Sequence, residues 1–202
     1  MAWQPYYATI FMEEINPERM FNIILVMGPP GVGKTTLLRK IFEEVRLIYS
    51  CQGFFTEEVR NEHVRVGFDV VTISGQRCVL ARERSEQSKQ MPKVGKYSIY
   101  INDFEKLVLP LIACANFKYE LLVIDEIGKM ELKSKKFEST LYELIHKMPI
   151  LATIPCALIK QSKLIESLKK AAKSKIYEIN KNNRDAIQKE IVKCINAVLK
   201  KN

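Results

Sequence analysis

The chain has 202 residues, of which 47% are hydrophobic and 27% charged, so it can bury one substantial core. Its formal net charge is +9, and Leu151–Asn202 contributes +8 of this through 12 Lys or Arg against 4 Asp or Glu. No run approaches the ~20 consecutive apolar residues of a membrane-spanning helix. Composition therefore excludes a helical membrane protein and predicts a soluble chain with no membrane partner.

The N-terminal segment and the cysteines bear on domain organisation and compartment. Residues 1–20 lack both the apolar block of an export signal and the Arg-rich, acid-poor composition of a mitochondrial presequence. We expect residues 1–20 to be an extension and residues 21–202 to form one domain. The five cysteines are widely spread and never paired as C-x-x-C, which argues against a disulfide framework or a zinc site. A reducing intracellular compartment, the cytoplasm, is predicted.

The first half of the chain predicts a buried strand, a helix and an antiparallel insert. Phe21–Met27 is a continuous apolar run before a glycine-rich turn, typical of a strand buried on both faces of a parallel sheet, and we expect it to be central. Apolar residues at three-to-four spacing predict a helix over Lys34–Ile48. Strands are expected at Gly53–Arg60, Val64–Ile73 and Arg77–Ala81. A mobile surface loop is expected to follow at Arg82–Lys93.

The second half alternates strands with helices. Strands are predicted at Tyr97–Ile101, Tyr119–Ile124, Ile150–Ile154 and Lys175–Ile179. Helices are predicted over Ser134–Lys147, Ser162–Lys173 and Asn183–Leu199. A further helix is predicted from Asn102 or Asp103 to Asn116, and Pro110 is expected to kink or interrupt it. The alternation predicts an α/β fold, a mostly parallel sheet flanked by helices, with an antiparallel β insertion after the first helix.

A phosphate-binding loop lies between the first strand and the first helix. The segment GPPGVGKT fits G-x-x-x-x-G-K-[ST] at every defined position. Glycines let successive backbone N–H groups surround a triphosphate, and the lysine reaches its β- and γ-phosphate oxygens. We expect Thr35 to ligate Mg²⁺ and Thr36 to lie on the α-phosphate side. The predicted nucleotide-binding residues are Gly28, Pro29, Pro30, Gly31, Val32, Gly33, Lys34, Thr35 and Thr36.

Two adjacent carboxylates follow the apolar strand LLVI, at the strand end where α/β sheets place ligands. Asp125 is predicted to hold Mg²⁺, and Glu126 to polarise a water for attack on the γ-phosphate, which points to hydrolysis. Glu126 could instead cap the following turn. Glu131 follows this motif closely and could support the two carboxylates without contacting the substrate, but its position alone establishes no role.

Three arginines are further candidates. Arg60 and Arg65 flank the expected hairpin, where either could approach the phosphates as a charge-stabilising arginine or make surface salt bridges. Arg184 begins the last predicted helix, where it could border the base or ribose or serve in a cap.

Six segments resemble those of the THEP1-type nucleoside-triphosphatase family in order and spacing: GPPGVGKTT (28–36), GFFTEEVR (53–60), VGFDVVTISG (66–75), VGKYSIYI (94–101), VIDEIGKMEL (123–132) and ATIP (152–155). The resemblance runs from about residue 21 to the C-terminus. It implies a RecA-like P-loop domain that uses Mg²⁺ to hydrolyse ATP, GTP and other NTPs slowly to the diphosphate and phosphate. It also implies a second set of nucleotide contacts, which is Leu121, Leu122, Val123, Ile124, Asp125, Glu126, Ile127 and Gly128.

Two other functions stay open on sequence grounds. A small-molecule or nucleotide kinase shares the loop, and its arginine-rich lid could draw on Arg77, Arg82 and Arg84. A nucleic-acid-stimulated ATPase could use the basic C-terminal region. We do not favour nucleic acid as a partner, because the lysines recur at helical spacing among apolar residues without interleaved aromatic side chains. We expect a monomer acting on nucleoside triphosphates.

Overall fold

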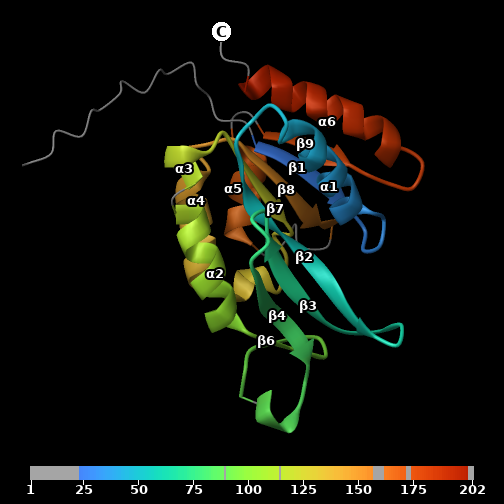
Figure 1. Ribbon diagram of the computed structural model, residues 1–202, viewed down its shortest axis with the longest axis vertical. Helices are drawn as coiled ribbons and strands as arrows, with labels where there is room; N and C mark the ends of the chain where they lie inside the picture. The colour runs from blue at the N-terminus through green and yellow to red at the C-terminus, as the bar shows by residue number, and fades with distance from the viewer. Residues whose placement is uncertain (1–22, 89, 114, 157–161, 172–173, 200–202) are drawn as a thin grey trace, which may run out of the picture.

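The computed structural model describes residues 23–88, 90–113, 115–156, 162–171 and 174–199. The expected extension over 1–20 and the start of the first predicted strand lie outside these ranges. The described strands join one nine-stranded sheet in the order β5-β6-β4-β3-β2-β7-β8-β1-β9 (Figure 1). They are β1 (Ile23–Gly28), β2 (Cys51–Asn61), β3 (Val64–Thr72), β4 (Arg77–Glu83), β5 (Lys93–Val94), β6 (Tyr97–Ile99), β7 (Leu121–Asp125), β8 (Ile150–Pro155) and β9 (Ser174–Glu178).

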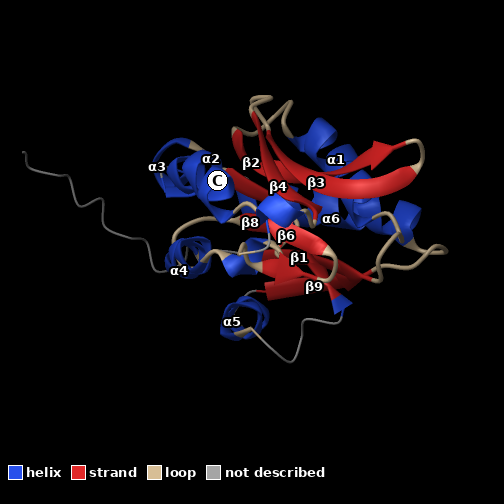
Figure 2. Cartoon of the chain, turned by 90° about the horizontal axis from the view of Figure 1, so that it is seen from below, coloured by secondary structure: helices blue, strands red, loops and turns tan. Residues whose placement is uncertain are grey.

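Helices cover both faces of this sheet, and each face has its own apolar core (Figure 2). The helices are α1 (Lys34–Val45), α2 (Ile101–Ala113), α3 (Ala115–Lys118), α4 (Lys135–Leu144), α5 (Lys163–Lys170) and α6 (Arg184–Leu199), with short 3-10 turns η1 (Glu86–Ser88) and η2 (Glu131–Lys133). Helices α1 and α6 pack on one face, and α2, α4 and α5 on the other. Within the described ranges, no helix is both long and apolar enough to cross a membrane.

The α/β prediction is confirmed, with strands and helices in the expected order and ends that differ by a few residues. Strand β1 is fully buried over most of its length, as its apolar run predicts. It is not central, however, because only β9 lies outside it on that side of the sheet. Helices on both faces and β9 along the edge give β1 the surroundings of an interior strand.

Strand β2 connects the parallel part of the sheet to the antiparallel part. Cys51–Phe55 pairs with β7 in parallel, up to the pairing of Phe55 with Asp125. Thr56–Asn61 then continues beyond the end of β7 and pairs with β3 alone. At Gly53 (φ +145) an added Cβ would come within 1.8 Å of the Val123 carbonyl oxygen, so the close approach of β2 to β7 requires glycine here. The predicted insert therefore begins inside a strand of the parallel sheet.

Two local predictions need correction. The segment predicted as a surface loop over Arg82–Lys93 contains the end of β4, the η1 turn and the start of β5. Ser88 in this segment is only 4% exposed and bonds to Ser98 through its hydroxyl, so part of the segment is packed. Of the two effects predicted for Pro110, interruption is wrong, since α2 continues to Ala113, and kinking stays a prediction. Its neighbours Val108 and Ile112 are fully buried, and this packing holds the last turn although proline donates no hydrogen bond.

The described cysteines are free thiols, in keeping with the expectation of no disulfide framework. Cys51 and Cys78 are half-buried, and burial raises the pKa of each to about 11. These two side chains therefore stay as neutral thiols near neutral pH.

Candidate active site

The predicted phosphate-binding loop connects the end of β1 to the start of α1. Gly31 (φ +73) and Gly33 (φ +103) both lie in the left-handed region, which side-chain-bearing residues rarely adopt. The two positions let the backbone curve within a few residues, which a chain needs in order to surround an anion with its N–H groups. The glycine pattern in the sequence thus corresponds to a loop of the predicted shape.

Lys34 lies across this loop, and its side chain is buried. Its ammonium donates to the carbonyl oxygens of Gly28 at 3.0 Å and Pro29 at 3.4 Å. The same nitrogen lies 3.4 Å from Oε2 of Glu126, at the end of β7. The structure therefore brings the two predicted motifs together, with the lysine charge between the loop and the second carboxylate.

Asp125 ends β7 and is 1% exposed. Strand β8 lies between β1 and β7, and the Thr153 hydroxyl from β8 donates to Oδ1 of Asp125 at 2.5 Å. Burial raises the pKa of Asp125, while the hydroxyls of Thr153 and Thr35 and the charges of Lys34 and Arg39 lower it. Oδ2 is buried and has no hydrogen-bond partner among the described residues. An oxygen of this kind fits a cation ligand, because a buried polar atom without a partner is costly.

Glu126 differs from its neighbour because its side chain keeps 33% of its surface exposed. Burial raises its pKa, the positive charge of Lys34 opposes this, and the negative charge of Asp125 adds to it. A carboxylate with solvent access, held beside the lysine of the predicted phosphate-binding loop, has the properties expected of a group that accepts a proton from water.

Glu131 is part of the same cluster, and a supporting position is one interpretation of its place in the sequence. It is 3% exposed, and its Oε2 accepts a hydrogen bond from the Gly128 N–H at 3.0 Å. A Cβ added at Gly128 would lie 2.8 Å from both Glu126 Oε1 and Glu131 Oε2, so the two carboxyl groups converge on this glycine. Burial and then the Glu126 charge raise the pKa of Glu131 to about 8. The only sequence signal was a glutamate between the apolar residues Met130 and Leu132.

The hairpin arginines lie away from these carboxylates. Arg60 and Arg65 both form ion pairs with Glu58, at 2.6 and 2.7 Å, and Arg60 also donates to the His63 carbonyl. All three charged side chains are more than a third exposed. The structure thus shows the surface salt bridges that the sequence left as one alternative for these arginines.

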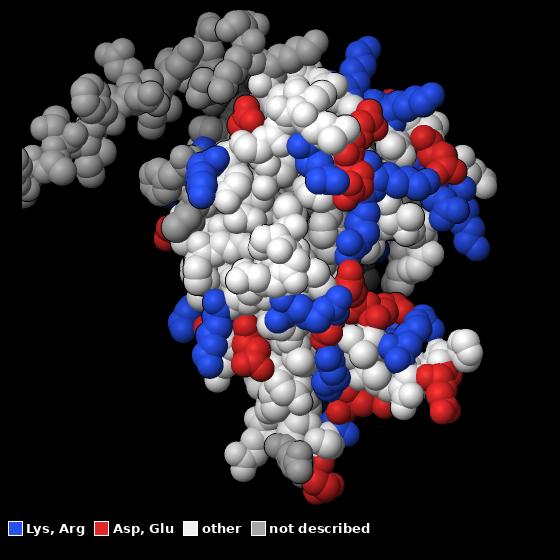
Figure 3. Space-filling view, viewed as in Figure 1, with Lys and Arg blue, Asp and Glu red and all other residues white. Residues whose placement is uncertain are grey.

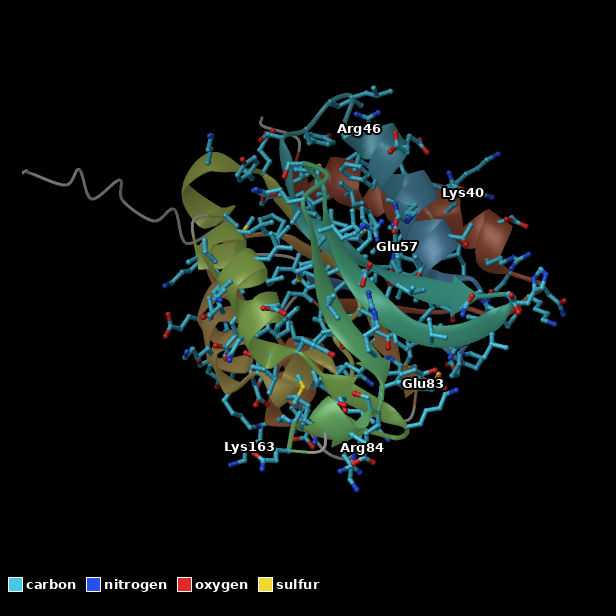
Figure 4. All side chains as sticks on the ribbon, turned by 60° about the horizontal axis from the view of Figure 1, so that its bottom comes forward. Lys40, Arg46, Glu57, Glu83, Arg84 and Lys163 are labelled. Atoms are coloured by element: carbon cyan, nitrogen blue, oxygen red, sulfur yellow. The ribbon has the colours of Figure 1, made fainter. Side chains whose placement is uncertain are left out.

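A second charged network, which the sequence did not reveal, ties α1 to the insert. Arg39 of α1 contacts Glu57 of β2 at 2.6 Å, and its guanidinium lies 4.3 Å over the Phe55 ring. Figure 4 shows Glu57 on the side of the insert that faces α1, the helix that also carries Lys40 and ends just before Arg46. Ion pairs join Arg77 to Glu57, Arg77 to Asp69 and Arg82 to Asp69. Two of the arginines considered for a kinase lid are thereby engaged within the insert.

Of the three candidate arginines, Arg184 is the one that reaches the predicted phosphate-binding loop. It is the first residue of α6, and its Nη1 donates to the Val32 carbonyl oxygen at 3.1 Å. The same nitrogen lies 3.0 Å from the position of a Cβ added at Gly33. The contact joins residues far apart in sequence, and α1 and α6 pack together behind it.

Comparison with known proteins places this arrangement in a family. The model of the family described as NTPase matches residues 23–192. The chain is 38% identical to the human cancer-related nucleoside-triphosphatase over 185 residues, covering 87% of this chain and 97% of the relative. It is 36% identical to nucleoside-triphosphatase THEP1 of Thermotoga maritima, covering 84% of this chain and 92% of the relative.

Solved structures agree with this. The crystal structure of THEP1 from Aquifex aeolicus aligns with a TM-score of 0.73 at 35% identity, covering 86% of this chain and 98% of that one. The solution structure of a human cancer-related nucleoside triphosphatase aligns with a TM-score of 0.76 at 37% identity, covering 87% and 98%. The chain thus shares a P-loop fold with these proteins, and this fold contains the loop, the buried Asp125 and the segments of the insert. The chain belongs to the NTPase family, as its resemblance to THEP1-type nucleoside-triphosphatases predicted.

Proposed function

We propose that this chain hydrolyses nucleoside triphosphates to the diphosphate and phosphate, with Mg²⁺, at the cluster formed by the phosphate-binding loop, Asp125 and Glu126. The observation that carries this proposal is the 3.4 Å approach of the Lys34 ammonium to the Glu126 carboxylate. This distance supports the proposal because a charge that could bind phosphate lies beside a carboxylate that could accept a proton. The names of the relatives, which are nucleoside-triphosphatases, point to the same reaction.

The loop and its lysine bind the phosphates. Gly31 and Gly33 shape the backbone around the anion, and Lys34 already lies within the loop, where its ammonium can exchange carbonyl contacts for β- and γ-phosphate oxygens. Recognition through the phosphates suits a substrate range that includes both ATP and GTP, because the triphosphate is common to all of them.

Asp125 and Thr35 are the residues that would hold Mg²⁺. Asp125 supplies a buried oxygen that has no hydrogen-bond partner in the described part of the chain, and Thr35 lies near enough to influence its pKa. One carboxylate and one hydroxyl suit an ion that takes its remaining ligands from water and substrate phosphates. When bound, Mg²⁺ would neutralise charge that develops on the phosphate oxygens.

Glu126 would activate the attacking water. Its carboxylate is partly exposed, so a water molecule can reach it, and Lys34 keeps a positive charge beside it. Accepting the proton of that water raises its nucleophilicity for in-line attack on the γ-phosphorus. The bond from the γ-phosphorus to the bridging oxygen then breaks, which releases the nucleoside diphosphate.

Replacing Glu126 by Gln tests the role of this carboxylate. The amide keeps the shape but is a very poor base, so we expect phosphate release to fall by about 10²- to 10⁴-fold while ATP binding is retained. Glu58→Gln, which changes a surface glutamate of β2, serves as the control and should keep the parent rate. A Glu126→Gln variant that binds ATP and turns over at the parent rate would show that Glu126 is not the base.

The same assay separates hydrolysis from a kinase reaction. The proposed mechanism requires no acceptor other than water. Phosphate release should therefore be seen with only ATP, Mg²⁺ and protein. Turnover that depends on an added nucleoside or nucleotide acceptor would contradict the proposal and favour a kinase.

The proposed partner is the nucleotide itself and not a nucleic acid. On the face shown in Figure 3, Lys and Arg side chains lie among Asp and Glu side chains without forming a basic stripe. A phosphate backbone is best held by a continuous positive track. We further propose that residues 21–202 form one domain, because the strands on either side of this cluster belong to one sheet. We also propose that the protein is an intracellular monomer. Nucleic-acid binding at low salt would contradict the first part of this proposal.

A further inference from the structure

Glu131 is a buried carboxyl group that the proposed reaction does not use. Only 3% of this residue is exposed, and it begins the η2 turn between β7 and α4. A carboxyl group is seldom buried without a partner, because it must give up its contacts with water. The contacts that Glu131 makes therefore indicate what it does at this position.

The backbone of Glu131 is anchored to α4 and, through α4, to α2. The Ser134 N–H donates to the Glu131 carbonyl oxygen at 3.0 Å. Ser134 caps α4, because its hydroxyl oxygen accepts from the Phe137 N–H at 3.0 Å, and its hydroxyl donates to Glu105 of α2 at 2.7 Å. The Phe137 side chain is fully buried and packs against Phe104 of α2. The η2 turn is thus a fixed support for the Glu131 side chain.

The same turn holds both backbone polar groups of Gly128. The Gly128 N–H donates to Glu131 Oε2 at 3.0 Å, and the Leu132 N–H donates to the Gly128 carbonyl oxygen at 3.1 Å. Just before this glycine, the Ile127 N–H donates to a carbonyl oxygen of β8 at 2.9 Å. The backbone that follows Glu126 is therefore held by β8 on one side and by Glu131 on the other.

The two oxygens of the Glu126 carboxylate face different partners. Oε2 lies 3.4 Å from the Lys34 ammonium. Oε1 lies 2.8 Å from the position of a Cβ added at Gly128, and Glu131 Oε2 lies equally close to the same point. The Glu126 and Glu131 oxygens are therefore separated by no more than twice this distance. Lys34 borders the Glu126 carboxylate on one side and Glu131 borders it on the other, which restricts its rotation.

A neutral Glu131 suits this close approach to a carboxylate. Burial, and then the charge of Glu126, raise the pKa of Glu131 to about 8, so it carries its proton near neutral pH. In this form it still accepts a hydrogen bond from the Gly128 N–H, but it does not repel its charged neighbour.

We propose that Glu131 is a positioning residue for hydrolysis, which holds the Glu126 carboxylate beside Lys34 by binding the Gly128 N–H and bordering Glu126 Oε1. It touches neither the nucleotide nor the attacking water, and it acts through Glu126. The inference rests on the proposed function for the role of Glu126. It goes beyond that function by assigning the orientation of the proton acceptor to a residue outside both predicted nucleotide-binding segments.

The test compares Glu131→Met, which has a similar volume but no acceptor for Gly128, with Glu131→Gln, which keeps an acceptor. Phosphate release from ATP with Mg²⁺ gives kcat and KM for each variant. We expect Glu131→Met to lower kcat by about 10- to 100-fold with KM changed less than about twofold, because only the catalytic group is misplaced. Glu131→Gln should restore most of the parent kcat. Glu143→Met, at an exposed position of α4, is the matched control and should keep both parent values.

A second measurement asks whether Glu131 acts through Glu126. The Glu126→Gln background lacks the carboxylate that Glu131 positions, so adding Glu131→Met should lower kcat little further. Additive losses would mean general disruption of the site and would overturn the inference. An unchanged kcat in Glu131→Met, a rise in KM alone, or equal losses in Glu131→Met and Glu131→Gln would also overturn it.

Gly128→Ala repeats the test if Glu131→Met does not fold. Its added Cβ would lie 2.8 Å from both Glu126 Oε1 and Glu131 Oε2, which is too close for either to stay in place. We expect the same loss of kcat with little change in KM, and a kcat equal to that of the parent would overturn the inference. The proposed function fails on a different result, which is a Glu126→Gln variant that keeps the parent rate.

Discussion

At the scale of single residues, the active-site cluster contains three carboxyl groups in three different environments. Asp125 is buried with one oxygen unpaired, Glu126 is partly exposed beside Lys34, and Glu131 is buried against the Gly128 N–H. Two ionised glutamates converging on one glycine would repel each other. Protonation of Glu131 removes this repulsion.

The raised pKa of Glu131 predicts a specific pH dependence of stability without metal and nucleotide. Between pH 4.5, its ordinary pKa, and about 8, the folded state holds a proton that the unfolded state has lost. The free energy of unfolding should therefore fall as the pH rises through this range and level off above it. Glu131→Gln keeps an acceptor for Gly128 but cannot ionise, so its stability relative to the parent should rise with pH.

Urea unfolding at several pH values measures this difference. Glu143→Gln, at an exposed glutamate of α4, is the matched control and should follow the parent at every pH. Parallel stability profiles for the parent and Glu131→Gln would show that Glu131 does not titrate in this range.

At the scale of elements, β2 and α1 hold the insert against the parallel half of the sheet, which carries the candidate active site. Thr56–Asn61 does not pair with β7, so its position depends on β3 and on contacts with α1. Arg39 provides such a contact with Glu57, which Arg77 also binds. A salt bridge between partly exposed groups is worth little alone, but a connected set of charges in good geometry is worth more.

A double-mutant cycle with Arg39→Ala and Glu57→Ala should show this difference. We expect a coupling free energy of about 1 kcal/mol, the upper end for partly exposed pairs. The pair of Glu43 in α1 with Arg46, the residue directly after this helix, is more exposed and is separated by three residues in the chain, so its coupling should be about 0.3 kcal/mol. Equal coupling for the two pairs would mean that the network adds nothing to the contact between α1 and β2.

At the scale of the whole molecule, the proposed site is assembled from segments of most of the chain. The phosphate-binding loop follows β1, the carboxylates end β7, and Arg184, which bonds to the loop, begins α6. A ligand that binds only this assembled arrangement must stabilise the folded state by mass action. Folding and substrate binding are therefore linked across the parallel half of the sheet.

Thermal unfolding of Glu126→Gln with ATP and Mg²⁺ measures this linkage. At a nucleotide concentration about 100 times the dissociation constant, stabilisation of about 2.7 kcal/mol is expected. Chelation of Mg²⁺ should remove much of it, since Asp125 would then face the triphosphate without the cation between them. Lys34→Ala should also reduce it. An unchanged transition temperature after chelation would contradict the assignment of the metal to Asp125 and Thr35.

The sequence alone determined the features that depend on neighbouring residues. Glycine spacing predicted the loop, apolar runs predicted β1 and β7, and alternation of strands and helices predicted the α/β fold, because turn geometry and burial pattern are local properties of the chain. Strand order is not local, and it decided that β1 lies next to an edge and that Thr153 bonds to Asp125. The contacts of Arg39 with Glu57 and of Arg184 with Val32 join distant segments, so only the tertiary structure revealed them. The place of Glu131 in the cluster follows from the sequence and the tertiary structure together. The sequence shows that it lies five residues after Glu126, while its burial depends on how the sheet and helices enclose it.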